Sequence, residues 1–436
     1  MAVYQKVGSF QLHTATGTQT IGGLGFQPKA ILFFHTPDTV DIATQTANYN
    51  MSYGVADGTN QYAICEFSPN GNNGNQTNWI AQTSNHCIVG SVDNSFIWRA
   101  SLTSLDADGF TINVIVAPSL GYRVGYLAIG GAGITGVKAG AFQMTTGSHS
   151  ETGFGFQPTG LIAFSAGLAS LPSTPSFGTT TSASIAYGFS DGTSNRTNGT
   201  YHYGYNFTTV KRRLRSARND NFLAAPNGTT SYAYAINLST FDASGFTVSN
   251  AINGGGNYAF YLAFGGAQTK VSNFLSPTVS GSFSITGLGF TPNAVLMGST
   301  WQTAFNSIEG EAIANGPGAL MSVGVATDLL EQLTFGATSQ GFTVTSVEGH
   351  HSDSLKLMRR FSHNPFTTLQ MDFSLSSFTP GQIDLLCSTA NATTSVISYM
   401  AIEGDGLIPP PPVDPTGGSG SPESPDSIFL LKYMGI

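Results

Sequence analysis

One phrase occurs three times in this sequence: GLGFQPKAILFF at residues 23–34, GFGFQPTGLIAF at 153–164 and GLGFTPNAVLMG at 287–298. The copies begin 130 and 134 residues apart. In each copy a proline precedes a short apolar run. This pattern is typical of a strand buried on both faces, because proline at the first position of a strand removes no hydrogen bond from the sheet. We therefore predict three equivalent buried strands.

Three further landmarks follow each copy in the same order. YGVADGT at 53–59 and YGFSDGT at 187–193 correspond to VGVATD at 323–328. DADGFTI at 106–112 and DASGFTV at 242–248 correspond to the weaker TPGQIDL at 379–385, and YLAIGG, YLAFGG and YMAIEG close the copies at 126–131, 261–266 and 399–404. This shared order indicates a triplicated unit. Asp-Gly at 57–58 and 191–192 predicts a tight hairpin turn with positive φ at both residues, and the third copy lacks this signal.

Composition narrows the fold class. The 436 residues include 53 glycines and 11% aromatic residues, but only 9% charged ones. Abundant glycine with few charged residues disfavours long helices and is typical of an all-β protein with many tight turns. We predict three tandem antiparallel β-sandwich domains, of jelly-roll or lectin-like type, at 1–132, 133–267 and 268–405, plus an extended C-terminal tail at 406–436. The short joints favour compact packing about a pseudo-threefold axis over an extended row.

Charge and hydropathy exclude several classes of function. A net charge of −8 disfavours a nucleic-acid binder that acts through overall charge. Three cysteines are too few for a disulfide framework. No apolar leader is visible at the N-terminus and no apolar run approaches about 18–20 residues, so neither a signal peptide nor contact with a membrane is expected.

Motifs for catalysis and cofactor binding are weak. Residues 131–136 read GAGITG, a formal GxGxxG, but this segment joins two copies and opens no helix, so we interpret it as a linker. His350, His351 and Asp353 lack partners at metal-ligand spacing and are interpreted as a polar loop. No enzyme, metal or cofactor is expected. Paired carboxylates that hydrolyse a polysaccharide stay open as an alternative, because such residues meet only in the fold.

One short segment concentrates the positive charge. Five of the 16 basic residues fall within eight positions: Lys211, Arg212, Arg213, Arg215 and Arg218. The third copy has a weaker counterpart at Lys356, Arg359 and Arg360. The clustering favours contact with an acidic surface of a protein partner. The alternatives are an exposed edge strand kept soluble by its charges and, less favoured, a nucleic-acid site.

The C-terminal tail changes composition sharply. Four prolines at 409–412 favour an extended segment, and GGSGS at 417–421 is typical of a flexible tether. The last ten residues turn apolar again. We interpret them as an anchor peptide that adds to the sheet edge of another protein, with five contact residues: Ile428, Phe429, Leu430, Leu431 and Tyr433. The alternative is a strand that folds back onto the third domain.

The repeated phrases resemble modules found in structural proteins of tailed bacteriophages. Their order is also similar to that of H-type lectin domains, which are six-stranded antiparallel sandwiches that associate as trimers. The phage resemblance implies a non-enzymatic virion protein, and a capsid cement or decoration protein is favoured. Its partners would be the major capsid protein or proteins of the tail or collar, and its place the virion, assembled in the bacterial cytoplasm.

The lectin resemblance implies an alternative from another class. A tail, collar or fibre component would then bind host polysaccharide as a receptor. Aromatic side chains that could stack on sugar rings are Trp79, Trp98, Trp301 and those of 201–205. We interpret these residues as core and sheet packing, which is the commoner role of aromatic residues in strands. The long insert between YGVADGT and DADGFTI departs from the compact lectin pattern, so no sugar-binding residues are assigned.

Overall fold

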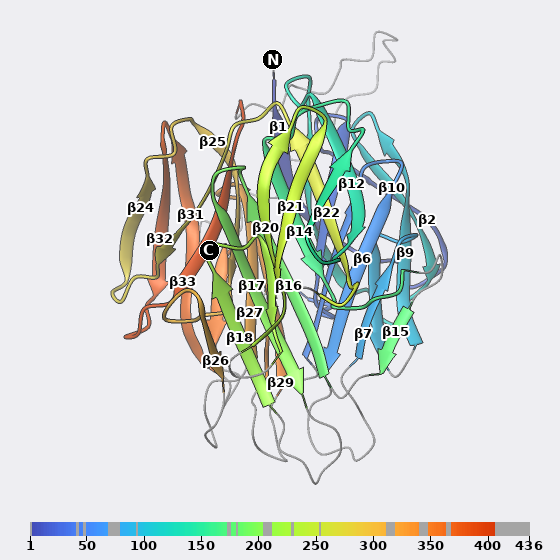
Figure 1. Ribbon diagram of the computed structural model, residues 1–436. Helices are drawn as coiled ribbons and strands as arrows, with labels where there is room; N and C mark the ends of the chain where they lie inside the picture. The colour runs from blue at the N-terminus through green and yellow to red at the C-terminus, as the bar shows by residue number, and fades with distance from the viewer. Residues whose placement is uncertain are drawn as a thin grey trace, which may run out of the picture.

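The computed structural model describes residues 2–405 apart from 41–42, 47–48, 69–78, 93–94, 172–175, 180–181, 204–211, 228–230, 253, 311–318, 340–347 and 363–367. Within this part the regular elements are strands, which pair antiparallel in six sheets. The predicted all-β, antiparallel fold class is confirmed (Figure 1). In the same part of the chain we find no helix of the length and hydropathy needed to cross a membrane.

The first sequence copy forms two facing sheets. The inner sheet contains, in spatial order, β1 (Tyr4–Gln11), β11 (Arg123–Gly130), β3 (Pro28–His35), β5 (Tyr49–Ala56), β6 (Gln61–Ser68) and β7 (Trp79–Thr83). The outer sheet contains β2 (Gly17–Gly22), β10 (Gly109–Val116), β9 (Ser95–Asp106) and β8 (Ile88–Val92). Trp98 and Phe110 lie in the apolar layer between the two sheets, which is the arrangement of a β-sandwich.

The second and third copies repeat this order strand for strand. The second inner sheet contains β12 (Gly136–Gln143), β22 (Tyr258–Gly265), β14 (Gly160–Ser165), β16 (Ser182–Ser190), β17 (Asn195–Tyr203) and β18 (Arg212–Arg218). Its outer sheet contains β13 (Ser148–Thr152), β21 (Gly245–Ile252), β20 (Tyr232–Asp242) and β19 (Leu223–Pro226). The third inner sheet contains β23 (Thr269–Leu275), β33 (Val396–Glu403), β25 (Pro292–Ser299), β27 (Ala319–Asp328), β28 (Glu331–Ser339) and β29 (Glu348–Asp353). Its outer sheet contains β24 (Gly281–Thr286), β32 (Gln382–Thr389), β31 (Leu369–Thr379) and β30 (Met358–Phe361).

Each inner sheet gains a seventh strand from the next copy. The second copy lends β15 (Ser176–Thr179) to β7, the third lends β26 (Ser307–Gly310) to β18, and the first lends β4 (Ala43–Thr46) to β29. In Figure 1 the green β15 lies beside the blue β7. This exchange closes a cycle, so the copies surround a common pseudo-threefold axis. Because each segment lends a strand to the sheet of another, the division into separate domains at 1–132, 133–267 and 268–405 stays a prediction.

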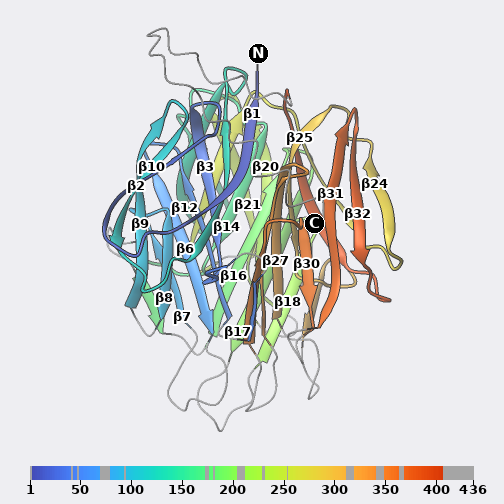
Figure 2. The same ribbon diagram turned by 180° about the vertical axis from the view of Figure 1, so that it is seen from behind.

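A shared apolar core fills the space around this axis. One cluster of buried side chains draws on all three copies, with Leu32 from the first, Ile162 from the second and Leu296 from the third. Tyr53 and Tyr187, the first residues of two landmarks, stack with ring centroids 5.6 Å apart. Figure 2, the view from behind, shows the same side-by-side packing of the blue, green and orange copies. The compact arrangement expected from the short joints is therefore observed.

The Asp-Gly landmarks form the predicted hairpins, with one correction. Gly58 and Gly192 have φ of 84° and 83°. The loop between β5 and β6 spans four residues, since Ala56 pairs with Gln61, and Asp57 does not share the positive φ. Its Oδ1 instead accepts hydrogen bonds from the N–H groups of residues 59 and 60, at 2.9 and 2.6 Å. The aspartate therefore closes the turn with its side chain, and only the glycine needs the left-handed conformation.

Candidate functional site

The hairpin landmark also joins each copy to the next. Asp57 Oδ2 accepts a hydrogen bond from the N–H of Ala139 in β12 at 2.8 Å, and Asp191 Oδ2 accepts one from Val271 in β23 at 2.7 Å. In the third copy Thr327 Oγ1 accepts from Val7 in β1 at 3.0 Å. In the copy that lacks Asp-Gly, the hydroxyl of Thr327 thus takes the role of the aspartate carboxylate. Each copy satisfies an N–H of its neighbour's first strand, so the landmark is a latch between copies.

We expect Asp191→Asn to lower the free energy of unfolding by about 1–3 kcal/mol, because an amide cannot supply both acceptor oxygens and leaves the Val271 N–H without its partner. Urea unfolding at neutral pH measures the change. Asp220→Asn is the matched control, since Asp220 is half exposed and pairs only with its neighbour Arg218, so we expect a change below about 1 kcal/mol there. Equal losses in both variants would contradict the latch.

One arginine binds all three copies together. Arg213 of the second copy is 1% exposed. Its Nε donates to Ser339 Oγ of the third copy at 2.6 Å, and its Nη2 donates to Ser68 Oγ of the first at 3.0 Å. A charged side chain is rarely buried unless its hydrogen bonds are made inside the fold. Arg213 is therefore a structural clamp near the pseudo-threefold axis.

Each interface between copies carries a contact between an acidic and a basic side chain. Three acid–base contacts span the interfaces: Glu66 Oε1 with His202 Nδ1 at 3.4 Å, Arg215 Nη2 with Glu309 Oε2 at 2.9 Å, and Asp38 Oδ1 with His350 Nε2 at 3.4 Å. Burial raises the pKa of Asp38, an effect opposed by His350 and by hydrogen bonds from Thr36 and Ser352. The three contacts differ in residue type, so the copies are not interchangeable around the axis.

Two other buried histidines stay neutral in the folded chain. Burial lowers the pKa of both His35 and His351 to about 3, and the neighbouring Arg359 and His350 add to the effect at His351. Trp98 Nε1 donates a hydrogen bond to His35 Nε2 at 2.8 Å, so this nitrogen carries no proton. An unfolded chain would protonate both rings near pH 6.5.

This difference predicts a loss of stability in acid. The contribution of each histidine is complete above pH 6.5 and falls as the pH drops toward 3, by about 1.4 kcal/mol per pH unit, because only the unfolded state binds the proton. We expect His35→Gln to flatten the dependence of unfolding free energy on pH between 6.5 and 4.5 by about one proton. The exposed His13 provides the control, and His13→Gln should leave the slope unchanged. An unaltered slope in His35→Gln would contradict the assignment.

The structure corrects the expectation of an exposed basic surface. Arg213 and Arg215 are 1% and 3% exposed, so neither belongs to an exposed basic surface. The edge-strand alternative is also wrong, because β18 lies between β17 and β26. Arg218 is partly exposed and pairs with Asp220 Oδ2 at 2.6 Å. Lys211 and the side chain of Arg212 lie outside the described residues, so their docking role stays a prediction.

The other residues predicted as sites are either buried in the fold or outside the described part of the chain. His350, His351 and Asp353 were expected in a polar loop, but they lie buried in strand β29. Across the part of the chain that is described, no three His, Cys, Asp or Glu residues converge as metal ligands would. Trp98 and Trp301 are buried, which confirms core packing for these two, whereas the side chain of Trp79 lies outside the described part. The tail at 406–436 lies outside it too, with all five predicted anchor residues: Ile428, Phe429, Leu430, Leu431 and Tyr433.

Sequence reasoning missed the acidic partners Asp38, Glu66 and Glu309. None of the three belongs to a recognised motif, so the sequence held no direct signal for it. The two-residue spacing of Arg213 and Arg215, which places both on one face of a strand, was the available hint that they act together.

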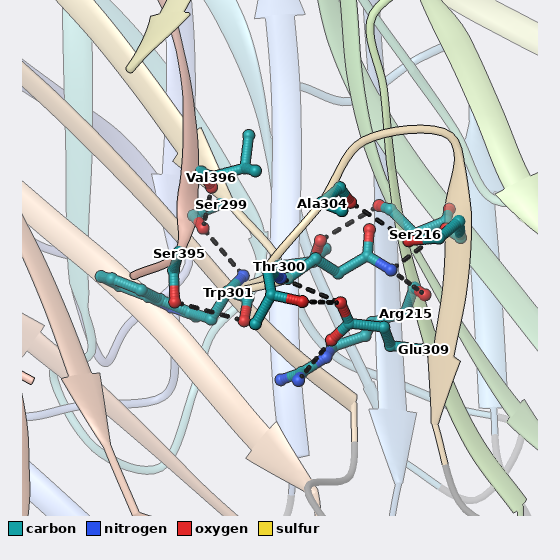
Figure 3. A network of polar contacts seen from close by, with 12 residues as sticks. Arg215, Ser216, Ser299, Thr300, Trp301, Ala304, Glu309, Ser395 and Val396 are labelled. Carbon is teal, nitrogen blue, oxygen red and sulfur yellow. Dashed lines mark hydrogen bonds and ion pairs between the residues drawn. The ribbon is translucent and has the colours of Figure 1, made fainter. Parts of the chain in front are cut away.

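A network of polar contacts joins the second and third copies (Figure 3). Glu309 Oε1 accepts hydrogen bonds from the backbone N–H and the hydroxyl of Thr303, at 2.9 and 2.8 Å, while its Oε2 binds Arg215. Thr300 Oγ1 donates to the carbonyl of Ser216 at 3.0 Å. The loop after β25 is thereby held against β18. This interface is the candidate site, because it gathers both basic segments of the sequence.

Comparisons with known proteins identify no family. No protein-family model matches the chain, and no curated protein is similar to it. Among solved structures, a BenF-like porin from Pseudomonas fluorescens Pf-5 matches at 10% identity with a TM-score of 0.08, over 92% of this chain and 99% of that chain. A TM-score this low carries no argument about fold or function.

Proposed function

We propose that this chain is a non-enzymatic structural protein of a virion, and specifically a cement or decoration protein that binds the assembled capsid. The observation that carries the proposal is the closed exchange of β4, β15 and β26, which makes one chain a permanent pseudo-trimer. Such a body offers three related faces around one axis. It can therefore contact a threefold or quasi-threefold position of a shell at three points without first assembling from monomers.

Two other features support this proposal. Some polar groups buried at the interfaces join one copy to another, as the clamp of Arg213 on Ser68 and Ser339 illustrates, which suits a rigid building block. The burial of Trp98 and Trp301 removes two of the three tryptophans from the set available for stacking on sugar rings. A receptor-binding role in a tail or fibre is the alternative, and it enters as an outcome of the test.

Binding to particles tests the proposal. Purified full chain, labelled at its N-terminus, is mixed with expanded capsids and with unexpanded shells of the phage that encodes it. We expect sedimentation with expanded capsids, and imaging should place one chain on each threefold or quasi-threefold position. Label on the tail or fibres would overturn the proposal. Retention on a host-polysaccharide column with elution by free sugar, or loss of polysaccharide viscosity, would equally overturn it.

A further inference from the structure

Among the described residues, the interface between the second and third copies holds more basic than acidic side chains. Within the described part of the chain Arg215 has one carboxylate partner, Glu309, and its Nε and Nη1 are buried with no hydrogen-bond partner there. Arg360 approaches from β30 of the third copy. Its Nη1 donates to Ser395 Oγ at 3.1 Å, its guanidinium carbon lies 5.9 Å from the ring of Trp301, and its Nε is also buried without a partner.

The two arginines act on one another. The pKa of Arg360 is lowered to about 10, mainly by burial and to a smaller extent by repulsion from Arg215. Attraction to Glu309 opposes this effect. Of the described residues, these two guanidinium groups and the carboxylate of Glu309 sum to one positive charge in a largely buried place. Unpaired buried charge and unsatisfied N–H groups both destabilise a fold. An arrangement of this kind is complementary to an anionic partner.

We propose that this interface binds one carboxylate, supplied by an acidic side chain or chain end of a protein partner. A carboxylate carries the single negative charge that neutralises the site, whereas a phosphate dianion would leave an excess. A carboxylate also matches the planar fork of a guanidinium with two parallel hydrogen bonds. Arg360 and Glu309 are both partly exposed, so the site opens to solvent on their side. The choice of a capsid protein as the partner rests on the proposed function.

The site is tested first with acetate as the probe. At constant ionic strength set with chloride, acetate at ten times its dissociation constant should raise the melting temperature of the full chain by about 1–2 °C. Arg360→Gln should abolish the rise, and Arg360→Lys should retain part of it. Glu309→Gln should bind acetate at least threefold more tightly, because it removes the competing carboxylate. Arg218→Gln, whose partner Asp220 lies outside the site, serves as the control with the full rise.

Several results would overturn the proposal. Equal shifts in wild type and Arg360→Gln would show that acetate acts elsewhere, and inorganic phosphate binding more tightly than acetate would exclude a site built for one charge. In the particle assay, Arg360→Gln should bind capsids at least tenfold more weakly. Unchanged capsid binding by this variant would overturn the role toward the partner while the proposed function stands. If wild type itself fails to bind capsids, the proposed function fails, and the acetate result is judged separately.

Discussion

Gly188→Ala is expected to destabilise the protein by about 3 kcal/mol, the upper part of the range for overpacking a core. A Cβ built at Gly188 would lie 1.9 Å from the carbonyl oxygen of Phe222 and 2.5 Å from that of Arg196. Both obstacles are backbone atoms, so neither can rotate away as a flexible side chain would. The inner sheet would have to move off the outer sheet, and the apolar layer between them would loosen.

The same close approach recurs in the other copies. A Cβ at Gly54 would lie 1.8 Å from the carbonyl oxygen of Cys87, and one at Gly324 would lie 1.6 Å from that of Leu357. We therefore expect similar losses at these two positions. This explains why the glycine persists in VGVATD, where the tyrosine and the Asp-Gly pair of the other landmarks are absent.

Urea unfolding followed by tryptophan fluorescence measures these effects. Gly22→Ala is the matched control, because it also replaces a strand glycine but its nearest atom to an added Cβ is 3.9 Å away. We expect a change within about 0.5 kcal/mol there. A loss below about 1 kcal/mol at all three landmark glycines would show that the two sheets can move apart at little cost in free energy. The explanation that close sheet packing requires these glycines would then be wrong.

The second large effect concerns a single copy expressed alone. We expect residues 133–267 to lack a stable monomeric fold. Strand β18 would lose its partner β26, and side chains that the second copy contributes to the shared core would meet water, among them Ile162, Phe260 and Leu262. At roughly 1.5–3 kcal/mol each, exposure of five such side chains costs about 8–15 kcal/mol, which equals the whole stability of a typical domain.

Self-association of the fragment is the main route by which it could escape this loss. A homotrimer would place three copies of Arg213 and of Arg215 around one axis, where like charges repel. We expect no trimer by sedimentation velocity in physiological salt. The double variant Arg213→Ser, Arg215→Ile should associate more strongly, since isoleucine is the residue of the first copy (Ile80) at the register position of Arg215. A folded monomer with dispersed NMR signals would contradict the shared-core account.

Part of the candidate site was predictable and part was not. The sequence groups Arg213 and Arg215 in one basic segment. It also indicated Arg360 as a counterpart in the third copy, but Arg360 lies in β30, which the strand order makes the equivalent of β19 and not of β18. It placed them on a surface, because exposure is the ordinary state of arginine. Burial of Arg215 depends on β26 and on the loop that carries Thr300, both supplied by the third copy about 90 residues away. A local sequence pattern around Arg215 contains no information about a segment so far away in the chain.

The sequence by itself determined the triplication, the strand-rich fold class and the places of the hairpin turns, because these follow from local periodicity and from the needs of glycine and proline. Only the tertiary structure decided which sheet receives β4, β15 and β26. Each is four residues long, and backbone hydrogen bonds pair almost any strand with any free edge. The choice follows from the packing of three copies around one axis. That packing turns a row of repeats into a closed body and places a basic segment inside it.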